Sequence, residues 1–322
     1  MGGMRAVYRK ELEDHWSSTR FTLLLTVILM IGFVVAFITG SALRKELEGM
    51  AKPSLVFLML FTSTGALFSF AQFIAFFGPL IGLVLGFDAV NRERAARTLP
   101  KLLAQPIHRD AIINGKFLAG LTTVAILLAS LLALIGGLGL WVLGVVPGPE
   151  ELGRLAVYFV VSVCYIGFWL GAAVLASVLF RGMATSALAV LALWIFLAFL
   201  VPLGATAVAG AIAPAPATVT SVADVEAMLR HEQVKQVASY VSPIQLYSDA
   251  TSLVLDPLRK TPRSLVLIGP LERLSLSRFQ NPLPLGQSAL VVAPHLVMLV
   301  AITAGCFAVT YAAFMRQEIR AI

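Results

Sequence analysis

Metal ligands and catalytic groups are more often histidine or cysteine than most other residue types. This chain of 322 residues holds only four histidines and two cysteines. His231 and Glu232 begin the pattern of zinc proteases, but the second histidine, four residues after the first, is absent. His295 stands alone near one end of an apolar run, where a packed side chain is far commoner than a catalyst. Cys164 and Cys306 also lie in apolar runs, and we expect two small apolar fillers instead of a disulfide or a metal pair. These residues predict no catalytic and no metal site.

Glycines next to a lysine can bind phosphate, but here their spacing is wrong. Gly115 and Lys116 are followed by Phe117, and no glycine stands five residues before Gly115. The glycines of residues 136–139 fall within an apolar run long enough to cross a membrane, where a dinucleotide site cannot form. We therefore expect a chain that is no enzyme and holds no cofactor. If it moves a solute uphill, the free energy must come from another subunit.

The densest group of charges is the segment 88–116, DAVNRERAARTLPKLLAQPIHRDAIINGK, between two long uncharged runs. Pro100 fits the first turn of a short helix and Pro106 ends it, which predicts a rigid helix over residues 101–105. The side chains available to a cytosolic partner are then the apolar Leu99, Leu102 and Leu103 and the charged Arg92, Glu93, Arg94, Arg97 and Arg109. The residues alone give nearly equal weight to a docking point and to a basic loop that merely faces the cytoplasm.

The composition indicates a membrane protein. Hydrophobic residues make up 59% of the chain, charged residues 13%, and the mean hydropathy is +0.90, whereas a soluble domain would be roughly 25% charged. Basic residues are scattered over loops, so the net charge of +7 predicts no nucleic-acid partner.

Six apolar segments predict an all-α protein with six transmembrane helices. They cover residues 21–40, 53–87, 117–146, 155–180, 183–213 and 288–315. As one helix the second segment would be about 52 Å long, well over a hydrocarbon core of ~30 Å. We expect it to be bent or divided, near Thr62–Gly65 or at Gly78-Pro79. Pro202 and Gly204 are expected to bend or end the fifth.

Small residues at a spacing of four predict close packing between helices. Gly78, Gly82 and Gly86 form one such row, and Gly167 and Gly171 form another.

The remaining segments divide the chain into four parts. Residues 1–20 form an amphipathic helix, which we expect at the membrane interface, although a cytosolic helix packed on a partner is the alternative. Residues 21–213 hold five spans and the cytosolic loop 88–116. The polar, proline-rich residues 214–287 form an extracytoplasmic insert with helices over 220–237 and 243–255 and an irregular remainder. Residues 288–322 hold the last span and a basic tail.

The basic residues also predict the orientation. Six spans place both termini on one side, and the short segments of that side carry most of the Lys and Arg residues near the spans. Since such residues concentrate in the cytoplasm, we expect both termini there and the insert outside.

The segment 88–116 resembles the cytosolic loop of ABC-2-type permeases, the membrane subunits of ATP-binding-cassette exporters. The family's pattern is E-R-x-x-G-T-L-x-x-L-L-x-x-P-[IV]-x-R, and its counterparts here are Glu93-Arg94, Thr98-Leu99, Leu102-Leu103, Gln105-Pro106-Ile107 and Arg109. Arg97 stands where a glycine is usual, so we expect a less tight turn before Thr98. The likeness covers essentially the whole chain, and within the family it extends to the permease of nitrous-oxide-reductase maturation.

The resemblance implies a function and its partners. Two permease copies, as a homodimer or pseudo-dimer in a prokaryotic plasma membrane, would work with two cytosolic ATPase subunits that bind ATP and Mg²⁺. The coupling residues would be Arg92, Glu93, Arg94, Thr98, Leu99, Leu102, Leu103, Gln105, Pro106 and Arg109. The apolar path favours export of a hydrophobic or amphipathic substrate. The alternatives are an ATP-driven mechanical module that acts on a periplasmic partner at 214–287 and, with little support, an intramembrane enzyme.

Overall fold

The computed structural model describes residues 2–48, 55–63, 69–100, 107–216, 221–256 and 283–316. The elements that it assigns there are helices: α1 (Gly2–Ser17), α2 (Thr19–Glu46), α3 (Val56–Thr62), α4 (Phe70–Gly86), α5 (Asn91–Ala95), α7 (Arg109–Leu143), α8 (Pro149–Leu179), α9 (Met183–Ile195), the π-helix η1 (Phe196–Leu200), α10 (Val201–Ile212), α11 (Val222–Ser239), α12 (Pro243–Leu255) and α14 (Leu285–Arg316). Six segments in this part of the chain are long and apolar enough to cross a membrane. The predicted all-α fold with six spans is confirmed.

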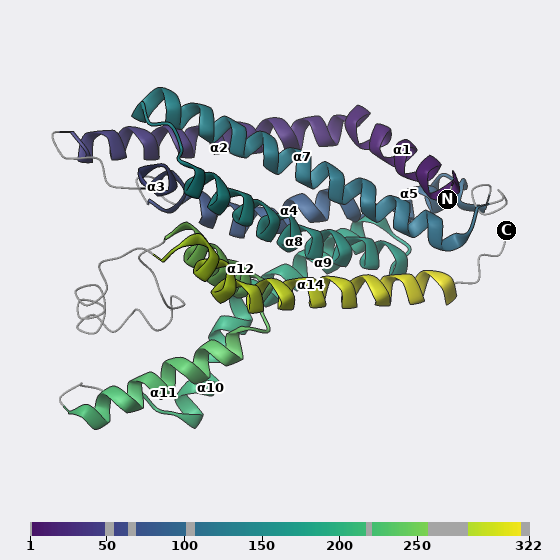
Figure 1. Cartoon of the computed structure of the whole chain (residues 1–322). Coiled ribbons are helices and arrows are strands. Elements are labelled where there is room, and N and C mark those ends of the chain that lie inside the picture. The colour runs from purple at the N-terminus through teal and green to yellow at the C-terminus, as the bar shows by residue number, and fades with distance from the viewer. Residues whose placement is uncertain are drawn as a thin grey trace.

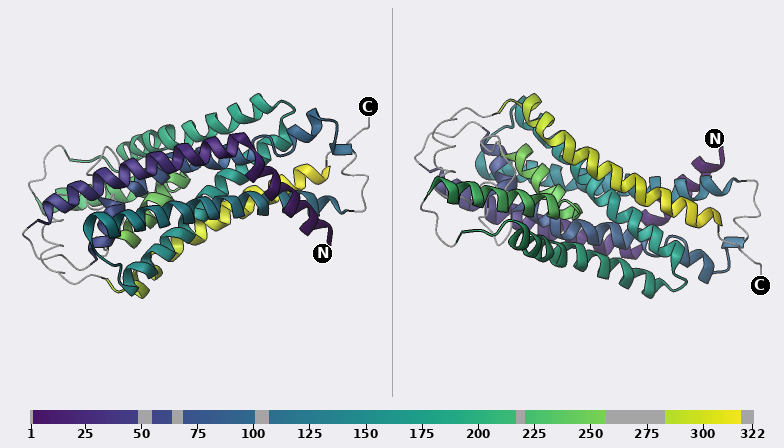
Figure 2. Two further views of the ribbon diagram at one scale, coloured as in Figure 1. Left: turned by 90° about the horizontal axis from the view of Figure 1, so that it is seen from above. Right: turned by 90° about the horizontal axis from the view of Figure 1, so that it is seen from below.

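The spans form one elongated bundle with both termini at the same end (Figures 1 and 2). We call this the terminal end and the opposite one the distal end. Helix α8 lies in the middle and contacts α4, α7, α9, α12 and α14. Helices α2, α9, α10 and α14 cover the outside, where they expose many large apolar side chains. The α10–α11 hairpin projects from the bundle (Figure 1).

The second apolar segment is divided into α3 and α4, with the break in residues 63–69. This agrees with the first of the two predicted break points, although residues 64–68 lie outside the described part. The side chain of Ser69 accepts a hydrogen bond from the amide of Gln72, whose own side chain accepts from the Ser69 amide. This reciprocal cap satisfies amide groups that would otherwise lack partners at the start of α4.

The second predicted break point, at Pro79, lies within a continuous α4. Proline has no N–H group, so the carbonyl of Ala75 loses its usual helical donor. The hydroxyl of Tyr165, on α8, donates to this carbonyl at 2.6 Å. Away from water an unpaired carbonyl is costly, and this bond explains how the helix continues through the proline.

The first glycine row lies where α4 meets α8. A Cβ atom on Gly82 would come within 2.6 Å of the backbone nitrogen of Leu170, and one on Gly86 within 2.7 Å of the Cβ of Ala173. Gly78 belongs to the same row. The two backbones therefore approach more closely here than any larger residue would allow.

The second row is less crowded. A Cβ on Gly167 would lie 3.1 Å from Leu121, and one on Gly171 would lie 3.6 Å from Phe117, both on α7. The nearest atoms belong to side chains, which can shift, so this interface tolerates more than the first.

The fifth span is distorted just before Pro202, as expected. In η1 the amide of Val201 donates to Phe196, one residue further back than in an α-helix, so it is not bonded to the carbonyl of Leu197. The hydroxyl of Ser242, at the start of α12, donates to Leu197 at 2.8 Å. The distortion thus anchors α12 to the fifth span.

Both predicted helices of the insert are present as α11 and α12, but α12 packs inside the bundle against α3, α4, α8 and α14. Its Tyr247 stacks on Tyr165 at 4.3 Å between ring centroids, and its hydroxyl lies 3.0 Å from that of Ser162. Asp249 of α12 is fully buried. The expected irregular remainder falls mostly in residues 257–282, outside the described part.

The fourth span begins earlier than predicted. It was expected to start at residue 155, but α8 already begins at Pro149, and Arg154 lies within this helix and is fully buried. Proline suits the first position of a helix, and the carboxylate of Glu151 accepts from the amide of Gly148 at 2.8 Å. These features extend the helix beyond its apolar residues.

Candidate functional site

The charged segment after α4 is fixed to α8 by its first amides. The turn that follows Gly86 leads into α5, whose early N–H groups have no partner within the helix. The hydroxyl of Ser177, on α8, accepts from the amides of Val90 at 2.9 Å and Asn91 at 3.1 Å. A buried serine of another helix therefore caps α5.

The same helix is bonded to the turn between α8 and α9. Arg94 donates to the carbonyls of Val178 at 3.2 Å and Phe180 at 3.3 Å, and the amide side chain of Asn91 donates to Gly182 at 3.3 Å. Carbonyls at the C-terminus of a helix lack helical partners and attract cations. Arg94, which we expected to face a partner, is thus engaged within its own chain.

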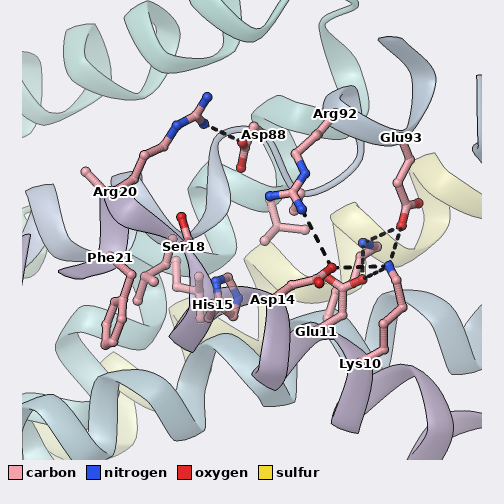
Figure 3. A pocket seen from close by; sticks show the side chains of 16 residues that line it. Lys10, Glu11, Asp14, His15, Ser18, Arg20, Phe21, Asp88, Arg92 and Glu93 are labelled. Carbon is pink, nitrogen blue, oxygen red and sulfur yellow. Dashed lines mark hydrogen bonds and ion pairs between the residues drawn. The ribbon is translucent and has the colours of Figure 1, made fainter. Parts of the chain in front are cut away.

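Four charges join α5 to α1 and α7, and we call Lys10, Glu11, Glu93 and Lys116 the Lys116 cluster. The ammonium of Lys116, on α7, lies 2.8 Å from Glu11 and 2.9 Å from Glu93, and its side chain is only 4% exposed. Lys10 lies 3.0 Å and 3.5 Å from the same two carboxylates. Figure 3 shows Lys10, Glu11 and Glu93 converging from α1 and α5.

The cluster is electrically balanced, with two ammonium groups and two carboxylates. Burial of Glu11 disfavours its charged form, but the nearby Lys116 and Lys10 outweigh this effect and lower the pKa of the carboxyl below its usual value. Removing both lysines or both carboxylates would leave buried charges uncompensated, so the attachment of the three helices depends on both signs of charge.

More exposed pairs surround the cluster. Arg20 lies 2.8 Å from Asp88, and Arg92 lies 3.6 Å from Asp14 (Figure 3). Exposed pairs contribute little to stability. His15 lines the same pocket, and burial lowers its pKa.

Helix α1 packs directly on the first turns of α7. A Cβ on Gly115 would lie 2.9 Å from the side chain of Val7, and the hydroxyl of Tyr8 donates to Thr122 at 3.1 Å. Met4 and Trp16 remain exposed. The structure thus gives α1 a packed face on this chain and leaves an apolar edge that suits the membrane interface.

Helix α5 ends at a tight turn around Arg97. The amide of Thr98 donates to Glu93 at 3.0 Å and that of Arg97 to Arg94 at 3.1 Å, the bond pattern of the motif in which a left-handed residue, usually glycine, ends a helix. Arg97 has a φ of 56°, a conformation that costs an L-residue about 1–2 kcal/mol. The expected loosening of the turn is therefore not found.

The other predicted coupling residues fall into two groups. Leu99 is 2% exposed and belongs to the core, and Arg109 is the exposed first residue of α7. Leu102, Leu103, Gln105 and Pro106 lie outside the described residues. The helix over 101–105 therefore stays a prediction.

Sequence reasoning missed the partners of this segment. Lys116 was taken only as the end of a basic loop, and neither Glu11 nor Ser177 was singled out. A lysine that directly precedes a long uncharged run, here residues 117–149, needs a nearby acid, and this could have pointed to the cluster. The serine had no such signal, because its role depends on how α4 and α8 pack.

In the ranges that the structure describes, no group of three or more His, Cys, Asp or Glu residues could hold a metal ion. The contacts described above hold α5 against α1, α7 and α8.

Comparison with protein families gives one match that covers nearly the whole chain. The description "ABC-2 family transporter protein" matches residues 5–319, and no curated protein matches. Such proteins are the multi-pass, non-catalytic membrane subunits of ABC-type transporters and work with an ATPase subunit. The chain belongs to the ABC-2 family of transporter proteins.

Proposed function

We propose that this chain is the permease through which a separate cytosolic ATPase exports a hydrophobic or amphipathic substrate. The ATPase docks on residues 88–109, and its ATP-driven closure displaces α5. ATP and Mg²⁺ belong to the ATPase, and the permease itself holds no cofactor.

The contacts of α5 with α1, α7, α8 and the turn before α9 are the observation that carries this proposal. Ser177, Arg94 and Asn91 bind it to α8 and the turn before α9, and Glu93 binds it to α1 and α7. A loop that only retained positive charge would need none of these contacts. A displacement of α5 must move several spans together.

Charge and exposure support the orientation and the assembly. Exposed arginines gather at the terminal end, at positions 5, 9, 92, 97, 109 and 181, which favours placing this end in the cytoplasm. We propose that the membrane is the plasma membrane of a prokaryotic cell. The exposed apolar faces of α2, α9, α10 and α14 contact lipid and a second permease copy. We propose a homodimer that works with two ATPase subunits.

Replacing both Leu102 and Leu103 with Asp tests the docking. We expect the variant to insert normally but to lose co-purification of the ATPase, because two carboxylates cannot enter an apolar groove. The matched control is Val241→Asp, an exposed apolar side chain near the start of α12, which should keep the ATPase. Unchanged co-purification of the double variant would refute the docking assignment.

A second experiment tests the orientation. In a background without Cys164 and Cys306, Lys260→Cys should react with an impermeant thiol reagent on intact cells, and Arg97→Cys only after lysis. The reverse pattern would invert the topology.

A mechanical module without transport is the second candidate, because α8 connects the two ends of the bundle. Its terminal end binds α5, and its distal part binds Tyr247 of α12. Movement of α8 could therefore act on a periplasmic partner of the insert. In liposomes, ATPase activity stimulated by an amphipathic substrate favours export, whereas stimulation by a periplasmic protein alone favours the mechanical role.

A further inference from the structure

Arg97 combines two features that rarely occur together in a residue without a function. Its backbone has a φ of 56° at a helix end where glycine would fit without strain, and its side chain is exposed. A plain surface position in that turn would favour glycine or asparagine. The chain nevertheless keeps a long cationic side chain there.

The fold itself does not use this guanidinium. Among the described residues no ion pair of Arg97 is found, whereas Lys10, Arg20, Arg92 and Lys116 are all paired with carboxylates. Arg94 caps the end of α8. These cations thus serve the chain's own architecture, whereas Arg97 makes no such ion pair among the described residues.

We propose that Arg97 recognises the ATPase subunit by binding a carboxylate beside the groove that receives residues 101–105. The inference rests on the proposed docking and adds the chemistry of the partner surface. The two amide bonds of the turn and the buried Leu99 fix the backbone on both sides of the arginine. Only the side chain then has to be ordered on binding, which favours affinity. A guanidinium also pairs with a carboxylate through two parallel hydrogen bonds.

A protein partner fits this position better than an anionic lipid headgroup. Arg97 follows α5, which lies near the terminal end of the bundle (Figure 1). Arg20, in the first turn of α2, is already paired with Asp88.

The test compares Arg97→Gly, Arg97→Glu and a control, Arg44→Ala, in full-length permease reconstituted in nanodiscs. Arg44 is an exposed arginine in the last turn of α2, at the distal end. The ligand is the ATPase subunit that co-purifies with the wild-type permease. We expect Arg97→Gly to raise the melting temperature by roughly 2 °C, because the strain is relieved, and to weaken ATPase binding about tenfold at low salt. Arg97→Glu should weaken binding further, and high salt should reduce both differences. Arg44→Ala should bind as the wild type does.

Each other outcome contradicts the proposal. Wild-type affinity in both Arg97 variants would show that the guanidinium does not contact the ATPase. A loss confined to nanodiscs with anionic lipid would assign Arg97 to the lipid instead. If the wild-type permease bound no ATPase at all, the docking function itself would be refuted, and this inference with it.

Discussion

The two ends of the bundle are held by different chemistry. At the terminal end the Lys116 cluster joins α1, α5 and α7 through two lysines that share two carboxylates. At the distal end one arginine bonds several segments to α8, and we call its contacts the Arg154 network. Arg154 donates to the carbonyls of Val254 and Leu283 and to the side chains of Ser288 and Glu150.

The two ends differ in how strictly their hydrogen bonds are directed and in whether a second residue can replace the first. An ammonium is a compact charge that can move between neighbouring carboxylates, and Lys10 duplicates part of the role of Lys116. A guanidinium has donors in fixed directions, and those of Arg154 reach two backbone carbonyls and a serine hydroxyl of other segments as well as Glu150 of its own helix. The ion pairs of the Lys116 cluster therefore tolerate a small shift, whereas the bonds of Arg154 hold α12 and α14 in one position against α8.

Removing Arg154 should have the largest effect. Arg154→Met leaves several buried acceptors without a donor and should lower the free energy of unfolding by about 3–5 kcal/mol. Arg154→Lys should recover only part of it, because an ammonium cannot reach all the acceptors. The measurement is thermal unfolding of the purified chain in nanodiscs.

Glu150→Gln is the control for the distal end, since Glu150 is the only carboxylate among the hydrogen-bond acceptors given above for Arg154 and its side chain is 44% exposed. We expect a change below about 1 kcal/mol. A loss as large as that of Arg154→Met would mean that ion pairing, and not carbonyl bonding, holds this end, and the contrast with the terminal end would disappear.

Removing Lys116 should have an intermediate effect. Lys116→Met leaves two carboxylates together, but Lys10 remains within 3.5 Å of both. We therefore expect the free energy of unfolding to fall by about 2 kcal/mol, which is less than the loss expected for a buried pair without such a substitute. Adding Glu11→Gln and Glu93→Gln should restore most of it, because the one charge then left in the cluster, Lys10, is half exposed and lies 3.5 Å from Asp14. If the loss matched that of Arg154→Met, or the triple variant did not recover, the terminal end would not be redundant.

Midway along α8, Tyr165 offers a smaller test that involves neither end. Tyr165→Phe should cost about 1 kcal/mol, because the carbonyl of Ala75 loses its donor. In a Pro79→Ala background the amide of residue 79 can serve that carbonyl, so Tyr165→Phe should there be nearly neutral. Equal losses in the two backgrounds would show that the bond does not replace the one lost at the proline.

The sequence predicts the spans better than the contacts between them. Long apolar runs give six helices, and Gly82 and Gly86 indicate the close approach of α4, because length and residue size are visible locally. The place of α12 was not predicted, since it depends on the bond from Ser242 to the carbonyl of Leu197 in the distorted fifth span and on the stacking of Tyr247 on Tyr165.

The same limit applies to the candidate site. The motif of 88–116 identifies the segment, and Glu93 and Leu99 within it are buried as structural anchors. The left-handed backbone of Arg97 could not be inferred, because arginine disfavours it and the two amide bonds that impose it depend on where α5 ends. Lys116 was misread for a related reason: its partner Glu11 is 105 residues away.

Lowering the pH should affect the two ends differently, and this is the smallest of the expected effects. The lysines hold the pKa of Glu11 below its usual 4.5 in the folded chain, despite its burial. A carboxyl with a lowered folded pKa stabilises fully above its unfolded pKa, and this contribution is lost as the pH falls through the folded one. The melting temperature of the wild type should therefore exceed that of Glu11→Gln at neutral pH, and the gap should close below pH 4.5. Backbone carbonyls do not titrate, so the gap between the wild type and Arg154→Met should persist over the same range. A gap for Glu11→Gln that stayed constant down to pH 3 would show that its charge contributes nothing to the attachment of α1.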